Sequence, residues 1–261
     1  MDLGIAGKVA LVTASSGGLG AAIAEALAAE GAAVAITGTN AEKLAKVESA
    51  IRAKGGKVIS LVWDLGKLDL IEPSIARIEA ELGPIDILVN NTGGPPPSPA
   101  GGQALDVWRK HFDSMILSVI AITDRVLPGM KARKWGRIIT STSMGVVAPI
   151  PNLGISNTLR ASLVGWSKTL SREVAKDGIT VNVMAPGRID TDRVKSIDAG
   201  VAKRDGKSVE EVAAASAATI PMGRYGTPAE FADVAAFLAS QRASYVTGST
   251  IRVDGGVIPN V

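Results

Sequence analysis

The sequence predicts an α/β fold: a single domain in which helices cover both faces of a doubly wound parallel sheet of seven strands. Apolar runs of strand length alternate with amphipathic segments of helix length along all 261 residues. The 46% apolar content is largely Ala, Val, Leu and Ile, with 3% aromatic residues, as is typical of buried parallel strands beneath Ala-rich helices. A glycine-rich turn also joins the first predicted strand to the first predicted helix.

The predicted elements follow one another in strict alternation. Strands are predicted at 9–13, 32–37, 57–63, 85–90, 137–141, 179–184 and 249–253. Helices are predicted at 19–30, 40–54, 67–82, 103–133, 152–176 and 228–240. Asn40 and Thr227-Pro228 have the chemistry of helix starts, and Gly31, Gly55 and Gly178 stand where helices should end. This alternation implies right-handed crossovers between parallel strands.

The turn after the first strand has the chemistry of a phosphate-binding loop. It runs through Thr13-Ala14-Ser15-Ser16-Gly17-Gly18-Leu19-Gly20. Free backbone N–H groups and the positive end of the helix dipole favour a pyrophosphate there, and Gly18 and Gly20 permit close approach. The strict G-x-G-x-x-G pattern is absent, and tight strand–helix turns also use Gly for packing. By itself the turn leaves nucleotide binding and plain packing both open.

Two later stretches follow strands, so they belong at the carboxyl edge of the sheet, where ligands bind in this architecture. Residues 93–99 (GGPPPSP) form a loop that breaks helices. Residues 190–226 form a long, charged, Ala-rich insert that is predicted to hold short helices around 191–199 and 208–218. The insert is interpreted as a substrate lid, with an oligomer contact or a surface excursion as the alternative.

Composition and charge exclude several classes of function. No apolar run reaches membrane-spanning length and no cleavable leader is evident, so a cytoplasmic protein with no membrane partner is expected. The chain has no Cys and one His, which excludes disulfides and cysteine metal sites; no metal is predicted. Net charge is a mild +3. The basic cluster of Lys131, Arg133, Lys134 and Arg137 is interpreted as a solvated helix end, not as a nucleic-acid surface.

Motifs along nearly the whole chain resemble those of the short-chain dehydrogenase/reductase family, in the family's order. The turn is similar to the family's T-G-x-x-x-G-[IL]-G, with Ala14 where the first glycine usually stands. The other matching stretches are Asp64-Leu65, Asn90-Asn91-Thr92-Gly93, Gly136-Arg137-Ile138-Ile139, Pro186-Gly187-Arg188-Ile189-Asp190-Thr191 and Val253-Asp254-Gly255-Gly256. The resemblance implies a Rossmann-type fold and a bound dinucleotide. The cofactor-binding residues it implies are Ala14, Ser16, Gly17, Gly18, Leu19, Gly20, Thr39, Asn40, Asp64, Leu65, Asn91, Thr92, Gly93, Arg160, Pro186, Gly187, Ile189 and Thr191.

The sequence departs from the family at the catalytic positions. Such enzymes use an Asn, a Ser, and a Tyr followed four residues later by a Lys. Ser143 matches the family's Ser, but the Tyr position holds Ser156 and the Lys position holds Arg160. The Asn position holds Met115, which is expected to fill the core. The only tyrosines, Tyr225 and Tyr245, lie far from this motif in the sequence.

These substitutions retain a hydroxyl and a cation, spaced i and i+4 on one face of a helix. Hydride addition to a carbonyl builds negative charge on oxygen, which the site must stabilise and protonate. Our hypothesis is that Ser143 and Arg160 stabilise the oxyanion while Ser156 relays a proton from water. Arg160 is also expected to hold the hydroxyls of the nicotinamide ribose. The alternatives are that Ser156 is a small helix residue and that Arg160 forms a structural ion pair.

The second strand is followed by Thr37-Gly38-Thr39-Asn40, without the acidic residue that usually binds the ribose 2′-hydroxyl of NAD. Ser16, Thr39 and Asn40, with Lys43 nearby, are candidates to receive a 2′-phosphate. NADP is therefore favoured as the cofactor, and NAD is the alternative because no Arg occupies the usual phosphate-binding positions.

The resemblance implies an NADP-dependent oxidoreductase that acts on a small-molecule carbonyl or alcohol, similar to the 3-oxoacyl reductase branch of the family. Two alternatives stay open, because a fold does not fix a function. One is a catalytically silent nucleotide-binding subunit that regulates or supports a partner, and the other is a non-redox enzyme such as a dehydratase or isomerase. The family also implies a homo-oligomer, either a homotetramer or a dimer, built on helices 103–133 and 152–176 and on the last strand.

Overall fold

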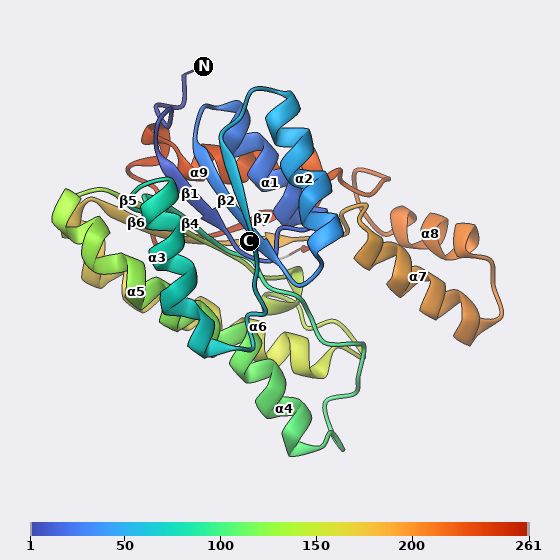
Figure 1. Cartoon of the computed structure of the whole chain (residues 1–261). Helices are drawn as coiled ribbons and strands as arrows, with labels where there is room; N and C mark the ends of the chain where they lie inside the picture. The colour runs from blue at the N-terminus through green and yellow to red at the C-terminus, as the bar shows by residue number, and fades with distance from the viewer. Residues whose placement is uncertain (1, 260–261) are drawn as a thin grey trace.

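The structure, a computed structural model, describes residues 2–259 and contains one seven-stranded sheet (Figure 1). All paired strands are parallel, in the order β3-β2-β1-β4-β5-β6-β7. The strands are β1 (Val9–Val12), β2 (Ala33–Gly38), β3 (Val58–Val62), β4 (Ile87–Asn90), β5 (Gly136–Ser141), β6 (Ile179–Pro186) and β7 (Thr250–Val253). The predicted fold class is confirmed, and each strand overlaps its predicted run. Strand order reverses direction between β1 and β4, so their carboxyl ends border a ligand crevice.

Helices cover both faces of the sheet (Figure 1). On one face α1 (Gly18–Ala29), α2 (Ala41–Ala53) and α9 (Pro228–Ala239) share an apolar cluster that includes the fully buried Phe231. On the other face α3 (Ile71–Glu81), α5 (Ser118–Arg133) and α6 (Gly154–Val174) share a second apolar cluster that includes Trp63. No helix among residues 2–259 has both the length and the apolar character needed to cross a bilayer.

The predicted helix 103–133 is divided into three segments in the structure. These are α4 (Leu105–Phe112), a π-helical turn η2 (Asp113–Leu117) and α5. The Ser114 hydroxyl donates a hydrogen bond to the carbonyl of Lys110 (3.1 Å), and side-chain bonding of this kind competes with the regular helical ladder. Periodicity alone predicted one continuous helix because a π turn adds only one residue to a repeat.

The insert at 190–226 forms two helices that project away from the sheet (Figure 1). They are α7 (Asp192–Asp205), longer than predicted, and α8 (Val209–Ala218). Asp198 anchors α7 because its carboxylate, which is almost fully buried, pairs with Arg188 (2.6 Å) and accepts a hydrogen bond from the Tyr225 hydroxyl (2.8 Å).

One member of the predicted basic cluster is not solvated. Arg137 is 1% exposed, because it is the second residue of β5, which begins at Gly136 and is buried along its whole length. Its guanidinium donates to the carbonyl of Ser240, just beyond the end of α9 (3.0 Å), and lies 4.5 Å from the centre of the Trp135 ring. The interpretation of this residue as part of a solvated helix end is therefore wrong; it is a buried cation that complements carbonyl groups at the amino edge of the sheet.

The turn between β1 and α1 is fastened to both neighbouring strands. Asn91, just after β4, donates its side-chain amide to the carbonyl of Ala14 (3.0 Å) and accepts at its own carbonyl from the Thr13 hydroxyl (2.6 Å). On the other side, the Thr37 hydroxyl accepts from the amide of Ala14 (3.1 Å). Ala14 has a φ of 46°, in the left-handed region that glycine adopts more readily. The turn thus holds an alanine in a conformation suited to glycine.

The Ala14→Gly variant is expected to raise the free energy of unfolding by about 1 kcal/mol. A left-handed conformation costs a residue with a Cβ roughly 1–2 kcal/mol, which exceeds the extra chain entropy that glycine loses on folding. Urea denaturation of the two proteins measures the difference. The control is Ala29→Gly at the exposed end of α1, where glycine should lower stability. A decrease in both variants would contradict strain at Ala14.

Candidate functional site

The carboxyl edge of the sheet brings together most of the predicted site residues. Ser16 lies against the end of β2, because a Cβ built on Gly38 would come within 2.8 Å of the Ser16 side chain. A Cβ built on Gly18 would lie 3.7 Å from the methyl group of Thr191, so the start of α7 borders the glycine turn. Along the same edge the Asn91 amide bonds to Ala14, which links the end of β4 to the turn.

The glycine turn presents an open helix N-terminus. Gly17 and Gly18 are exposed, and no acidic residue occurs in the first turn of α1. Gly20 is required for packing, because a Cβ there would lie 2.7 Å from the Ala14 carbonyl oxygen and 2.9 Å from the Asn91 amide nitrogen. The exposed backbone N–H groups and the helix dipole make this end of α1 suited to a phosphate group.

The residues predicted for the adenosine end lie beyond β2 and β3. Thr39, Asn40 and Asp64 are exposed, whereas Leu65 is buried. The Asn40 side-chain oxygen accepts from the Lys43 amide (2.9 Å) and so caps α2. Only the amide nitrogen of Asn40 is then available to a ligand phosphate. Asp64 accepts from the Gly66 amide (2.9 Å), which fixes the loop after β3.

At the centre of the edge a buried hydroxyl lacks a partner. Among the described residues nothing hydrogen bonds to the Thr92 hydroxyl, although it is buried. Native structures rarely leave such a group unsatisfied, so a bound molecule is expected to complete it. With the open phosphate cradle at α1, this hydroxyl makes the edge fit a dinucleotide. Asn91, Thr92 and Gly93 would face its nicotinamide half.

The loop after β6 supplies the remaining predicted contacts. Gly187 allows close backbone packing, because a Cβ there would lie 2.7 Å from the Cα of Asp254. Ile189 is buried and bridges to Gly226, and Thr191 caps α7 through the Val194 amide (3.4 Å). Pro186 ends β6 directly before this loop.

The three predicted catalytic residues come from two adjacent elements. Ser143 follows β5, and its Oγ accepts from the Gly145 amide (3.1 Å), which leaves its proton available to an oxygen acceptor. Ser156 and Arg160 lie one turn apart on α6, and each is 8% exposed. No described residue hydrogen bonds to the Ser156 hydroxyl.

Arg160 joins the ends of two strands. Its guanidinium donates to the carbonyl of Ser141 on β5 (3.2 Å) and to that of Gly93 after β4 (3.0 Å). Burial, with the nearby charge of Arg193 as a smaller cause, lowers the pKa of Arg160 to about 10, so the group stays protonated at neutral pH. No carboxylate in residues 2–259 pairs with it, so the alternative of a structural ion pair finds no partner there.

The positions that depart from the family have clear structural places. Met115 is 1% exposed in the π turn, packed with Ile116, Val119 and Ile155, so its predicted place in the core is confirmed. Tyr245 is fully exposed, and the Tyr225 hydroxyl is engaged by Asp198. Burial is the largest of the causes that raise the pKa of Tyr225, so this phenol is not set up as an acid.

Arg193 was not among the predicted site residues. It lies in the first turn of α7, and its guanidinium donates to the carbonyls of Pro95 (2.6 Å) and Gly94 (3.4 Å) in the loop after β4. The sequence carried one usable signal, an arginine two residues beyond Thr191 in a segment expected, like the Gly/Pro-rich loop, at the carboxyl edge of the sheet. That signal was lost among the many charges of the insert.

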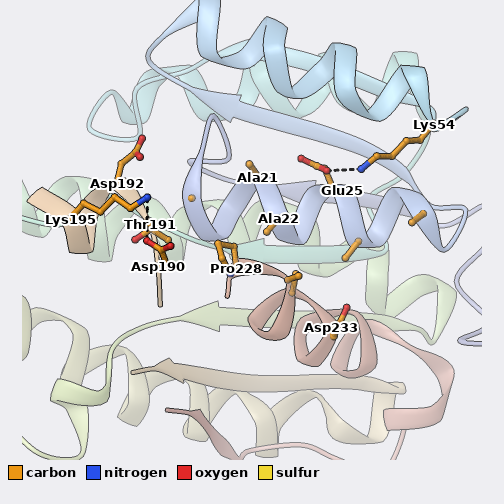
Figure 2. A pocket seen from close by; sticks show the side chains of 15 residues that line it. Ala21, Ala22, Glu25, Lys54, Asp190, Thr191, Asp192, Lys195, Pro228 and Asp233 are labelled. Atoms are coloured by element: carbon orange, nitrogen blue, oxygen red, sulfur yellow. Dashed lines mark hydrogen bonds and ion pairs between the residues drawn. The ribbon is translucent and has the colours of Figure 1, made fainter. Parts of the chain in front are cut away.

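A hollow of about 500 Å³ lies beside the glycine turn, between α1, α9 and the start of α7 (Figure 2). Gly18 and Thr191 line it, but none of Ser143, Ser156 and Arg160 does. The figure shows its rim carrying two ion pairs, Lys54 with Glu25 (2.9 Å) and Lys195 with Asp190 (3.3 Å). This hollow therefore lies beside the glycine turn and apart from the three predicted catalytic residues.

Known proteins resemble this chain along almost its whole length. A family model described as enoyl-(acyl carrier protein) reductase matches residues 13–258. The 3-oxoacyl-[acyl-carrier-protein] reductase of Salmonella typhimurium is 39% identical over 253 residues, which cover 96% of this chain and 97% of that protein. Nodulation protein G of Azospirillum brasilense is 36% identical over 251 residues, covering 96% and 98% of the two chains.

Solved structures are similar over the same length. L-sorbose reductase from Gluconobacter frateurii, complexed with NADPH and L-sorbose, has a TM-score of 0.95 at 33% identity, with full coverage of both chains. YwfH, an NADPH-dependent reductase involved in bacilysin biosynthesis, has a TM-score of 0.92 at 32% identity, with 97% and 99% covered. From its glycine turn, its sheet and these matches, the chain belongs to the short-chain dehydrogenase/reductase family.

Proposed function

We propose that this protein is an oxidoreductase that transfers a hydride between NADP(H) and a carbonyl or alcohol substrate. The observation that carries the proposal is the convergence of a phosphate cradle at α1 with Ser143, Ser156 and a buried cation, Arg160, on one sheet edge. The 3-oxoacyl reductase and the NADPH-bound L-sorbose reductase among its relatives support the same class of reaction, and the former supports a 3-oxoacyl-type substrate.

In this proposal the chain's own residues stabilise and protonate the carbonyl oxygen, and a bound NADPH would supply the hydride for the carbonyl carbon. Ser143 donates a hydrogen bond to the oxygen, and the positive charge of Arg160 stabilises its developing negative charge. Ser156 passes its proton to that oxygen and takes one from water, so the carbonyl becomes an alcohol. Arg160 also holds the nicotinamide-ribose hydroxyls. The helices α7 and α8 close over the substrate as a lid.

NADP is the proposed cofactor in preference to NAD. A carboxylate at the end of β2 would repel a 2′-phosphate, and none is present there. Hydrogen-bond donors are offered instead by Ser16, Thr39 and Lys43.

We expect NADPH to bind at least about tenfold more tightly than NADH, since hydrogen bonds to a charged phosphate are worth roughly 1.5–3 kcal/mol. Calorimetric titration of both nucleotides measures the ratio, and Lys43→Met should reduce the NADPH affinity alone. Equal affinities for the two nucleotides would contradict the proposed preference for NADP.

Arg160→Ala is expected to weaken NADPH binding and to lower kcat, each by roughly 10- to 100-fold, because it removes a charged donor from both cofactor and oxyanion. Fluorescence titration and the rate of NADPH oxidation measure the two effects. The matched control is Arg172→Ala, an exposed arginine on the same helix, which should change neither. Unchanged values in Arg160→Ala would defeat the assigned role.

The profile of kcat/KM against pH provides a second readout. It should be flat from about pH 6 to 9, because the pKa of Arg160 is lowered only to about 10 and the serines do not titrate. An ionisation within that range would indicate a different proton donor.

The absence of a tyrosine from the trio favours a second candidate, a silent nucleotide-binding subunit. The two functions separate with purified protein: NADPH binding without oxidation by a panel of carbonyl compounds would support the silent subunit, and oxidation would exclude it.

We also propose a homotetramer. Helix α4 exposes Leu105 and Phe112 (68% and 41%), seven residues apart on one face, while Trp108 of the same helix packs against the apolar cluster of α6. Phe112→Glu should convert tetramers to smaller species in light scattering, whereas Lys110→Glu on the same helix should not. A wild-type monomer would contradict the proposal.

A further inference from the structure

Two guanidinium groups meet beside one glycine in the loop after β4. A Cβ built on Gly94 would lie 3.2 Å from an Nη atom of Arg193 and 3.5 Å from an Nη atom of Arg160. The two arginines come from different elements, the lid helix α7 and the core helix α6. The fold thus holds two like charges close together, against the repulsion between them.

Neither charge has a counter-ion in the part of the chain that the structure describes. Their hydrogen bonds go to four backbone carbonyls, those of Ser141, Gly93, Gly94 and Pro95. The acidic residues near Arg193 in the sequence do not pair with it: Asp190 pairs with Lys195 and Asp198 with Arg188, and no ion pair joins the adjacent Asp192 to Arg193 in residues 2–259. Desolvation lowers the pKa of both arginines, of Arg160 because it is buried and of Arg193 because its guanidinium is partly covered although the residue as a whole is exposed.

The cofactor does not supply the missing anion at this position. Its pyrophosphate belongs at the N-terminus of α1 and its 2′-phosphate beyond β2, whereas Gly94 and Pro95 follow the nicotinamide contacts Thr92 and Gly93. An arginine pair with no carboxylate partner is a common way to bind a carboxylate, because the guanidinium fork matches its two oxygens.

We propose that Arg193, together with Arg160, binds a carboxylate of the substrate, so that the preferred substrate is an oxo acid whose carbonyl lies at Ser143. This inference rests on the proposed reductase function and narrows it to anionic carbonyl compounds. Arg193 is the specificity-determining partner because it alone of the two lies on the lid. The carboxylate would neutralise the pair and hold α7 against the loop after β4.

The test compares three oxo acids with their methyl esters: 2-oxopropanoate, 3-oxobutanoate and 4-oxopentanoate. Wild-type protein with NADPH should show a kcat/KM at least about tenfold higher for one acid than for its ester, the scale of a charged hydrogen bond. Arg193→Met should remove that preference, lowering the acid's kcat/KM by roughly 10- to 100-fold and the ester's by less than about threefold. Arg204→Met, at the exposed far end of the same helix, is the matched control and should behave as wild type.

A binding measurement keeps the two proposals distinguishable. Calorimetric titration of the same acids into protein saturated with NADP⁺, where no hydride is available, should show binding that Arg193→Met weakens and Arg193→Lys partly restores. Melting temperatures and NADPH affinity of the variants confirm that they fold. Reduction of esters as fast as acids, or acid binding equal in wild type and Arg193→Met, would overturn the carboxylate site and leave the reductase proposal standing. Acid binding that depends on Arg193 without any NADPH oxidation would support the site and overturn the reductase.

Discussion

The candidate site depends on one buried charge, the guanidinium of Arg160. It joins the carbonyls that end β4 and β5, and so it fixes the spacing between the loop that carries Thr92 and the strand that leads to Ser143. Withdrawing such a group from water is costly unless its donors are satisfied and its charge is answered. The backbone carbonyls accept hydrogen bonds from the guanidinium donors, but they do not balance its positive charge. In residues 2–259 no carboxylate supplies the balancing negative charge.

The fold was readable from the sequence because its elements are periodic and their ends are marked. Parallel strands such as β1 and β6 are buried on both faces, so they appear as continuous apolar runs. Asn40, Thr227 and the glycines that end helices placed most helix boundaries within two residues. The π turn at Asp113–Leu117 and the burial of Arg137 were missed, since both arise from tertiary contacts that leave no trace in local periodicity.

Only part of the candidate site could be predicted from the sequence. Its glycines and hydroxyls follow strands in fixed order, so a parallel sheet brings them to one edge. Arg193 illustrates what sequence reasoning could not reach, because its partners in the loop after β4 lie 98 and 99 residues away and are backbone carbonyls without a sequence signature. The Thr92 hydroxyl, which has no hydrogen-bond partner within residues 2–259, is likewise a property of the packed structure, since its burial depends on elements distant in the chain.

Thr191 connects the projecting insert with the glycine turn. It begins the projecting helix α7, and its methyl group lies against the glycine turn of α1. A dinucleotide held at the turn would lie beside this residue, so its presence would bear on how α7 sits. We therefore expect a compulsory kinetic order, in which the nucleotide arrives before the other reactant and departs after the product.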